Sequence, residues 1–157
     1  MPFAKKPQVF GAKINELTLG TGDKATVLGG QNVFNLYTFD APIANRPKIG
    51  IDVSDDPEQP SEGLKEFYAG CETLADRAKK AAGVAEADFV CIRFDLADPN
   101  GANKSIEDCV ADAKAVAEAI DKPLVVAGCK NSEKDADLFG KISEALQGKN
   151  ILVLSAK

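Results

Sequence analysis

The sequence predicts an α/β fold with a parallel β-sheet, because one pattern recurs three times along the chain. In each copy an apolar run of strand length ends in polar residues, and a helical segment follows. The runs begin near residues 48, 88 and 123, and residues 89–104 of the second copy read FVCIRFDLADPNGANK. Strands that alternate with helices in this way form βαβ units, whose strands lie parallel. Their carboxyl ends meet at the edge where such folds bind ligands.

The first 47 residues precede this pattern and are predicted to form a β-rich extension and linker. Residues 13–19 alternate as KINELTL, a Gly-Thr-Gly-Asp turn follows, and residues 24–28 run back to close a hairpin. Residues 33–39 are expected to add a third short strand. Residues 40–47 contain two prolines and lead into the main fold.

Residues 48–157 are predicted to follow the order β-α-β-α-β-α-β. The strands are expected at residues 48–53, 88–94, 123–128 and 151–154. Apolar residues at helical spacing predict one continuous helix over residues 61–82. A second helix is expected to start at the cap Ser105, with Asp108 as its capping-box partner, and a third at the cap Ser132.

Two architectures fit this order, a small doubly wound sheet and half of a (β/α)₈ barrel. A complete barrel typically needs about 250 residues, and this chain of 157 residues stops three residues after its last predicted strand. A parallel sheet without a covering layer leaves its faces and edge bare, which proteins avoid. We therefore expect about half of a TIM barrel, its N-terminal part, in truncated form.

Side-chain alternation assigns the two faces of the sheet. In the second strand Val90, Ile92 and Phe94 share an apolar face that should meet the helices. The opposite face carries Arg93, and in the first strand it carries Asp52. Since a buried charge needs a partner, we expect Asp52 and Arg93 to be neighbours and to form an ion pair.

Composition excludes several functional classes. The net charge is −5 with dispersed acidic residues, which argues against nucleic-acid binding. No apolar run approaches the roughly 20 residues of a membrane span, and the first residues lack the apolar core of a secretory signal. We therefore expect a cytoplasmic protein without a membrane partner.

Cysteine and histidine usage narrows the possible chemistry further. The chain has no histidine, so Ser–His and Cys–His dyads and imidazole metal ligation are absent. Its four cysteines form no Cys-x-x-Cys pair, and we expect buried, reduced thiols rather than a zinc or iron–sulfur site. These cysteines are Cys71, Cys91, Cys109 and Cys129.

The polar loop after the second predicted strand allows three readings. Asp95, Asp98 and Asn100 have the spacing of a loose cation loop, but they match the EF-hand pattern poorly. Asp-Pro and Asn-Gly are strong turn formers, so turn formation is the favoured reading. Ligand contact by these side chains comes second, and metal binding comes last.

Two sequence blocks resemble a known family. They are ANRPKIGIDVSD at residues 44–55 and ADFVCIRFDLADPNGANKSIEDCVADAKAVAEAIDKPLVVAG at residues 87–128. Both are similar to the small (delta) subunit of the corrinoid iron–sulfur protein, which belongs to the CO dehydrogenase/acetyl-CoA synthase system. The segments INELTLG and VLGG are also similar. The resemblance spans nearly the whole chain here but only about the first half of a family member.

This resemblance implies a TIM barrel that follows a short β-rich extension. It implies a heterodimer with a large subunit, which carries a [4Fe–4S] cluster and a mobile cobalamin domain. The corrinoid (cobalamin), shared between the subunits, would accept a methyl group from methyltetrahydrofolate through a separate methyltransferase. It would then deliver that group to the nickel cluster of acetyl-CoA synthase, in the acetyl-CoA (Wood–Ljungdahl) pathway of one-carbon metabolism and carbon fixation.

The resemblance also turns the polar residues at the strand ends into candidate contacts for the amide side chains of the corrinoid. No catalytic residue and no metal ligand is expected on this chain. Two alternatives remain, a pterin-dependent methyltransferase whose Asp and Asn side chains hold the pterin, and a structural scaffold for the large subunit. The candidate corrinoid contacts are Asp52, Ser54, Asp95, Asn100, Asn103 and Asn131.

Overall fold

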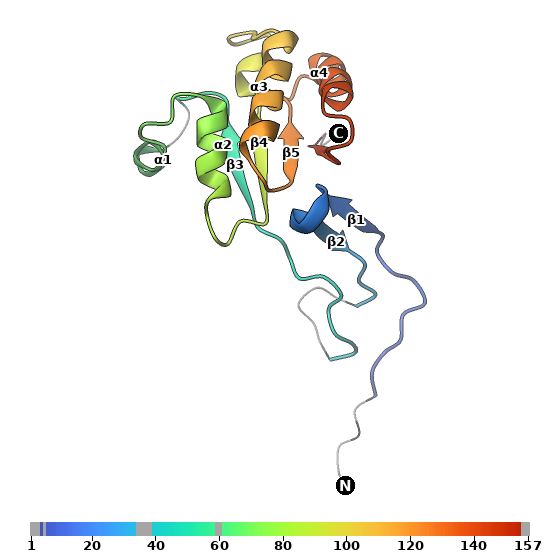
Figure 1. The fold of residues 1–157 in the computed structure, drawn as a ribbon. Helices are drawn as coiled ribbons and strands as arrows, with labels where there is room; N and C mark the ends of the chain where they lie inside the picture. The colour runs from blue at the N-terminus through green and yellow to red at the C-terminus, as the bar shows by residue number, and fades with distance from the viewer. Residues whose placement is uncertain (1–3, 5, 34–38, 59–60, 155–157) are drawn as a thin grey trace.

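The computed structural model describes residue 4 and residues 6–33, 39–58 and 61–154. In this part of the chain β1 (Glu16–Leu19) and β2 (Thr26–Gly29) form an antiparallel hairpin. A four-stranded parallel sheet follows, made of β3 (Gly50–Ser54), β4 (Phe89–Arg93), β5 (Leu124–Ala127) and β6 (Leu152–Leu154). The predicted hairpin and parallel α/β sheet are therefore confirmed (Figure 1). Most of the third strand expected at residues 33–39 lies outside the described residues.

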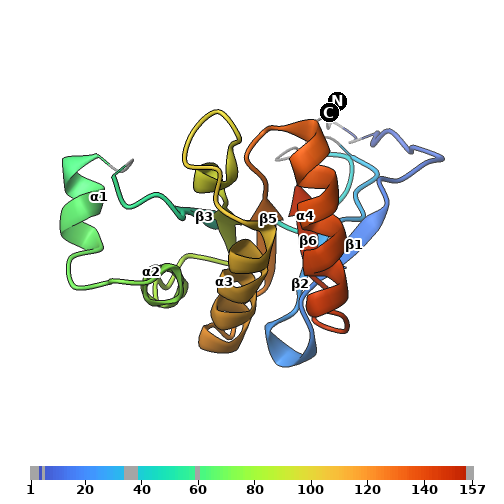
Figure 2. The same ribbon diagram turned by 90° about the horizontal axis from the view of Figure 1, so that it is seen from above.

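Three helices cover one face of the parallel sheet. They are α2 (Leu74–Ala82), α3 (Ile106–Ala119) and α4 (Ser132–Ala145), and they lie on the same side of the strands (Figure 2). Neighbouring helices pack against each other, α2 on α3 and α3 on α4. The sheet has the sequential order β3-β4-β5-β6. Right-handed crossovers between sequential parallel strands place every helix on the same face.

The core lies between this sheet face and the three helices. Val90, Ile92 and Phe94 are fully buried, which confirms the predicted apolar face of β4. Their neighbours from the flanking strands include Val53 and Val126. The opposite sheet face is not covered by any helix of the described chain, although Val125 on that face is buried.

The hairpin closes the amino-terminal edge of the parallel sheet (Figure 1). The Gly20 N–H donates to the carbonyl of Asn150, and the Asn150 side-chain amide donates to the Thr18 carbonyl at 2.6 Å. Gly20 has a φ of +74°, and a Cβ there would lie 2.9 Å from Pro123. Only glycine permits this approach to the segment before β5. The buried Leu19 then anchors the hairpin.

The prediction of one continuous helix over residues 61–82 is wrong, because the segment forms two helices. α1 (Glu62–Phe67) ends early and α2 starts at residue 74. Thr73 and Asp76 form a complete capping box that starts α2 afresh, and Gly70 adopts a φ of +80° between the helices. α1 buries no side chain, and Leu64 remains 48% exposed. The apolar stripe predicted across both helices is therefore not one buried face.

The other helix starts agree with the sequence more closely. The Ser105 hydroxyl accepts from the Asp108 N–H at 3.1 Å and caps α3, as predicted. For α4 the predicted cap Ser132 is wrong by one residue. Asn131 occupies the cap, and its side-chain oxygen accepts from the Lys134 N–H. Asn and Ser cap helices about equally well, so local sequence alone did not separate them.

We predict that Leu19 stabilises the protein far more than Leu17 on the same strand. Leu19→Ala should lower the free energy of unfolding by about 2–5 kcal/mol, because the side chain is 1% exposed and the truncation leaves a cavity. Leu17→Ala is the matched control, since Leu17 is 46% exposed. Urea unfolding of the complete polypeptide measures both changes. Equal losses in the two variants would contradict the placement of the hairpin.

Candidate functional site

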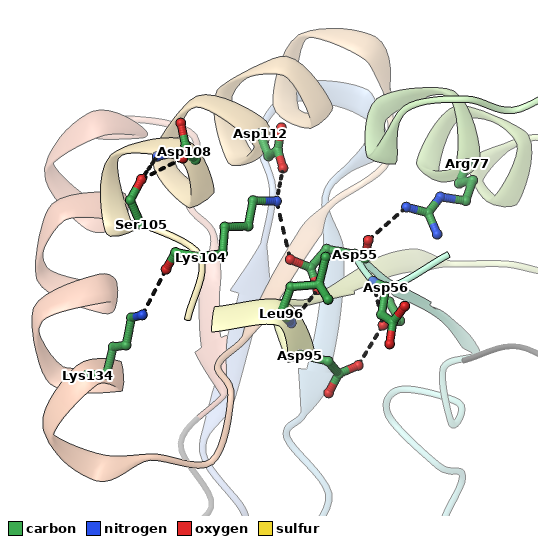
Figure 3. Close-up of polar contacts among 11 residues, drawn as sticks. Asp55, Asp56, Arg77, Asp95, Leu96, Lys104, Ser105, Asp108, Asp112 and Lys134 are labelled. Carbon is green, nitrogen blue, oxygen red and sulfur yellow. Dashed lines mark hydrogen bonds and ion pairs between the residues drawn. The ribbon is translucent and has the colours of Figure 1, made fainter. Parts of the chain in front are cut away.

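The carboxyl-terminal edge of the sheet collects the polar loops that follow β3, β4 and β5 (Figure 3). The loop after β4 begins with a 3₁₀ turn at Asp95–Ala97 and continues to the cap of α3. Because all four strands run parallel, these loops meet at one end of the sheet, away from the hairpin. This edge is the place where parallel α/β folds form ligand sites.

The first cluster at this edge joins β3 and β4. Arg93 forms ion pairs with Asp52 and with Asp95, the latter at 2.6 Å from its Nε. The Ser54 hydroxyl donates to the same carboxylate oxygen of Asp95 at 2.6 Å. The predicted Asp52–Arg93 pair is thus confirmed. The guanidinium brings Asp52 and Asp95 together, and Ser54 joins the cluster through its bond to Asp95.

The pKa of Arg93 reflects this arrangement. Partial burial alone would lower the pKa of the guanidinium, but the carboxylates of Asp95 and Asp52 outweigh burial and raise it. The group is therefore a permanent cation that fixes the orientation of two carboxylates.

A second cluster is built around the buried carboxylate of Asp55, directly after β3 (Figure 3). One of its oxygens accepts from the Leu96 N–H at 3.0 Å, and the other lies 3.3 Å from Lys104 Nζ. Lys104 also pairs with Asp112 of α3 at 2.5 Å. The Asp55 carbonyl accepts from Arg77 Nη2 of α2 at 3.1 Å. Asp55 therefore connects the loop after β3 to the loop after β4 and to two helices.

Lys134 extends this network to α4. Its Nζ donates to the Lys104 carbonyl at 2.8 Å and to the Asn103 side-chain oxygen at 2.7 Å. Asn103 adopts a φ of +52°, which asparagine tolerates better than most residues. The loop after β4 is therefore held at both its beginning and its end.

The candidate asparagines serve local structure as well. Asn100 is exposed and bonds to Asp98 within its own turn, which is the turn chemistry that the sequence favoured. Asn131 caps α4 and Asn103 binds Lys134. Asp52, Asn100 and Asn103 remain exposed at the edge, whereas Ser54, Asp95 and Asn131 are half-buried.

The loop after β5 is held by a carboxylate of α4. Asp135 accepts from the backbone N–H groups of Cys129 and Lys130, at 2.8 and 3.0 Å. A Cβ at Gly128 would lie 2.1 Å from Asp135 Oδ1, so only glycine fits beside this carboxylate. The third loop is therefore fixed as firmly as the first two.

The cysteines are free thiols, as predicted, and two of the four, Cys109 and Cys129, are buried. Burial raises the pKa of Cys91 to about 12 and that of Cys109 to about 11, so neither is a thiolate nucleophile at neutral pH. Among the described residues no group of three or more His, Cys, Asp or Glu side chains is placed to hold a metal ion.

Sequence reasoning missed Asp55, Lys104, Arg77 and Lys134. The only local signal was the Asp-Asp pair directly after the first strand and the lysine directly before the cap of α3. Neither position reveals its partner, because Asp55 and Lys104 lie 49 residues apart in the chain.

The fold and this edge define the class, a parallel α/β protein with an ordered polar edge and no histidine. A family model described as "CO dehydrogenase/acetyl-CoA synthase delta subunit" matches residues 16–157. The chain belongs to this family.

Curated relatives agree with this assignment. The chain is 29% identical to the acetyl-CoA decarbonylase/synthase complex subunit delta of Archaeoglobus fulgidus, over 98% of this chain and 36% of the relative. It is 33% identical to the subunit of the same name from Methanothermobacter thermautotrophicus, over 94% of this chain and 38% of the relative. It is also 29% identical to the acetyl-CoA decarbonylase/synthase complex subunit delta 1 of Methanosarcina thermophila, over 87% of this chain and 31% of the relative. The chain thus spans less than two fifths of the length of these relatives.

None of the described helices has both the length and the apolar character that crossing a membrane requires.

We predict that Asp55→Asn destabilises the protein by about 2 kcal/mol or more. The variant keeps an acceptor for the Leu96 N–H but removes the charge that faces Lys104 in a buried site. Asp112→Asn is the matched control, because Asp112 pairs with the same lysine from a side chain that is 37% exposed. Asp112→Asn should lower the free energy of unfolding by less than about 1 kcal/mol. Urea unfolding distinguishes the two, and equal effects would contradict the central role of Asp55.

The pKa of Lys104 predicts how this stabilisation depends on pH. Burial alone would lower the pKa, but Asp112 and Asp55 outweigh burial and raise it above 10.5. A raised pKa in the folded state gives stabilisation that is complete below the unfolded-state pKa, about 10.4, and is lost as pH rises through the folded-state pKa. The stability difference between the wild type and Lys104→Met should therefore be constant from pH 7 to about pH 10 and shrink above it. A difference that shrinks below pH 9 would contradict this.

Proposed function

We propose that this chain is the N-terminal part of the small subunit of a corrinoid iron–sulfur methyl carrier. In this role it helps to hold cobalamin, which passes a methyl group from methyltetrahydrofolate methyltransferase to the nickel cluster of acetyl-CoA synthase. The proposed partners are the large subunit, which bears the [4Fe–4S] cluster, that methyltransferase and acetyl-CoA synthase, all in the cytoplasm. The observation that supports this most directly is membership of the delta-subunit family over residues 16–157.

We further propose that residues 48–157 are the first βα units of a TIM barrel, and that residues 1–47 are an extension before it. The sequential strand order and the placement of α2, α3 and α4 on one face support this, because a doubly wound sheet carries helices on both faces. Leu154, on the uncovered side of the last strand, is 51% exposed. The relatives are longer than this chain, and the match covers only 36% and 38% of their length, which leaves room for the further βα units that a barrel needs.

The exposed residues of the edge fit a corrinoid in their chemistry. A corrinoid carries amide side chains that both donate and accept hydrogen bonds. Asp52 offers an acceptor, and the exposed amides of Asn100 and Asn103 offer donors and acceptors. Ser54, Asp95 and Asn131 would support these contacts from the half-buried layer below. When bound, the corrinoid supplies the cobalt that carries the methyl group.

This chain's own contribution is to bind and orient. The Arg93 guanidinium holds Asp52 and Asp95 in fixed positions, and the Asp55 network fixes the loop that carries Asn100 and Asn103. A preorganised edge lowers the entropic cost of binding a large ligand. Proton transfer by histidine has no part in this role, which agrees with its absence from the chain.

A structural scaffold for the large subunit is the second candidate. One observation favours it, since each of the six proposed contact residues already has a partner within the chain. Ser54 bonds to Asp95, Asn103 binds Lys134 and Asn131 caps α4. The pterin-dependent methyltransferase is not favoured, because the matched family and relatives are delta subunits.

We predict that Asp52→Ala combined with Asn100→Ala weakens corrinoid retention by roughly tenfold, because two exposed polar contacts are lost. The test is the visible absorbance of corrinoid that remains on the purified heterodimer after gel filtration. Asp121→Ala is the matched control, since Asp121 is an exposed carboxylate beside Lys24 at the opposite end of the sheet. Full retention and unchanged methyl transfer in the double variant would favour the scaffold.

A further inference from the structure

A pocket of about 190 Å³ lies between α1, α2 and the carboxyl ends of β3 and β4. It adjoins the polar edge and shares Asp52, Ser54 and Arg93 with the first cluster there, and α1 forms its outer wall. The pocket is lined by Asp52, Val53, Ser54, Asp56, Ser61, Leu64, Tyr68, Arg77 and Arg93.

Arg77 brings a buried positive charge to this pocket. The residue is 7% exposed, and its Nη2 donates to the backbone carbonyl of Asp55. Its Nε is buried and has no hydrogen-bond partner among the described residues, and no carboxylate there pairs with it. A buried guanidinium with an unsatisfied donor is costly unless an acceptor of opposite charge is supplied. The Asp55 carboxylate is not available, because it is already bound to Lys104.

Tyr68 presents a second unsatisfied group in the same pocket. Its hydroxyl oxygen is buried and has no partner within the described part of the chain. Burial raises the pKa of Tyr68 above its ordinary value, so the group is a neutral O–H donor. Arg77 and Tyr68 line the same pocket, and the positive charge of Arg77 lowers the pKa of Tyr68 in part. Buried donors are normally hydrogen-bonded, so one acceptor that binds both Arg77 and Tyr68 would satisfy the two unpaired groups in this pocket.

We propose that this pocket binds a carboxylate group, with Arg77 and Tyr68 as its donors. Guanidinium and carboxylate match in charge and in planar geometry. A phosphate fits less well, because Asp52 and Asp56 also line the pocket and repel a second negative charge. Val53 and Leu64 provide apolar walls that suit a short aliphatic chain. The volume equals that of about six waters, enough for a group the size of acetate to butyrate. This inference does not rest on the corrinoid role.

Entry to the pocket requires little apolar surface to be uncovered. α1 contributes no buried side chain, and Leu64 and Phe67 remain 48% and 37% exposed. A wall with so little burial opens at low free-energy cost. The carboxylate has two possible sources, a free small acid or the side chain of an Asp or Glu from another segment or subunit.

The test is a thermal-shift titration of the complete polypeptide with sodium acetate against sodium chloride at equal ionic strength. Acetate should raise the melting temperature in a saturable way, because it binds the folded state. Tyr68→Phe removes one donor without changing the shape of the ring, and should weaken the apparent acetate affinity about tenfold. Arg46→Lys is the control, since Arg46 is an exposed arginine paired with Asp88, and should match the wild type.

A crystal structure of the complete polypeptide grown in acetate separates the two sources. Acetate within hydrogen-bond distance of Arg77 Nε and Tyr68 Oη, together with the saturable shift, establishes a site for a free acid. An Asp or Glu side chain in that position, with no acetate shift, establishes an internal or partner carboxylate. Water alone in the pocket, with equal responses to acetate and chloride, overturns the proposal. Tyr68→Phe leaves the Arg77 contact to Asp55 intact, so the comparison does not depend on a folding defect.

Discussion

The arrangement of the polar edge depends on the contacts of one buried group, the carboxylate of Asp55. It lies directly after β3, and it binds the backbone of the loop after β4 and the ammonium group of Lys104. Lys104 in turn reaches α3 through Asp112, and its carbonyl is bound by Lys134 of α4. One charged group therefore ties the loops of adjacent strands to the helices. A buried carboxylate without these partners would be strongly destabilising.

The two ends of the sheet are closed by different kinds of interaction. At the amino end the hairpin packs Leu19 inward and bonds to Asn150, so apolar burial and backbone hydrogen bonds close that end. At the carboxyl end charged and amide side chains are fixed by one another and partly exposed. In parallel α/β folds generally, the carboxyl end of the sheet carries the functional residues and the amino end serves stability. This division supports a binding role for the edge in the delta-subunit family.

Local patterns in the sequence predicted the strands, which side chains lie on each face of the sheet, and the Asp52–Arg93 pair, because side-chain alternation in a strand has a fixed period. They failed at the break between α1 and α2, where apolar residues continue at helical spacing but the Thr73 capping box starts a new helix. The Asp55–Lys104 pair was not predictable either. Both residues lie at element ends, and only the packing of the βαβ units brings them within 3.3 Å. The six candidate residues lie at or after the carboxyl ends of β3, β4 and β5, and their internal partners became visible only in the structure.

The most direct test of the corrinoid role is the cofactor content of the native complex that contains this chain. The measurement is the mass of the purified complex together with its cobalt and iron content and visible spectrum. The corrinoid role predicts a larger polypeptide with a co-purifying partner, about one cobalt per heterodimer, and the combined absorbance of corrinoid and an iron–sulfur cluster. A colourless, partner-free species of 16.6 kDa would contradict it.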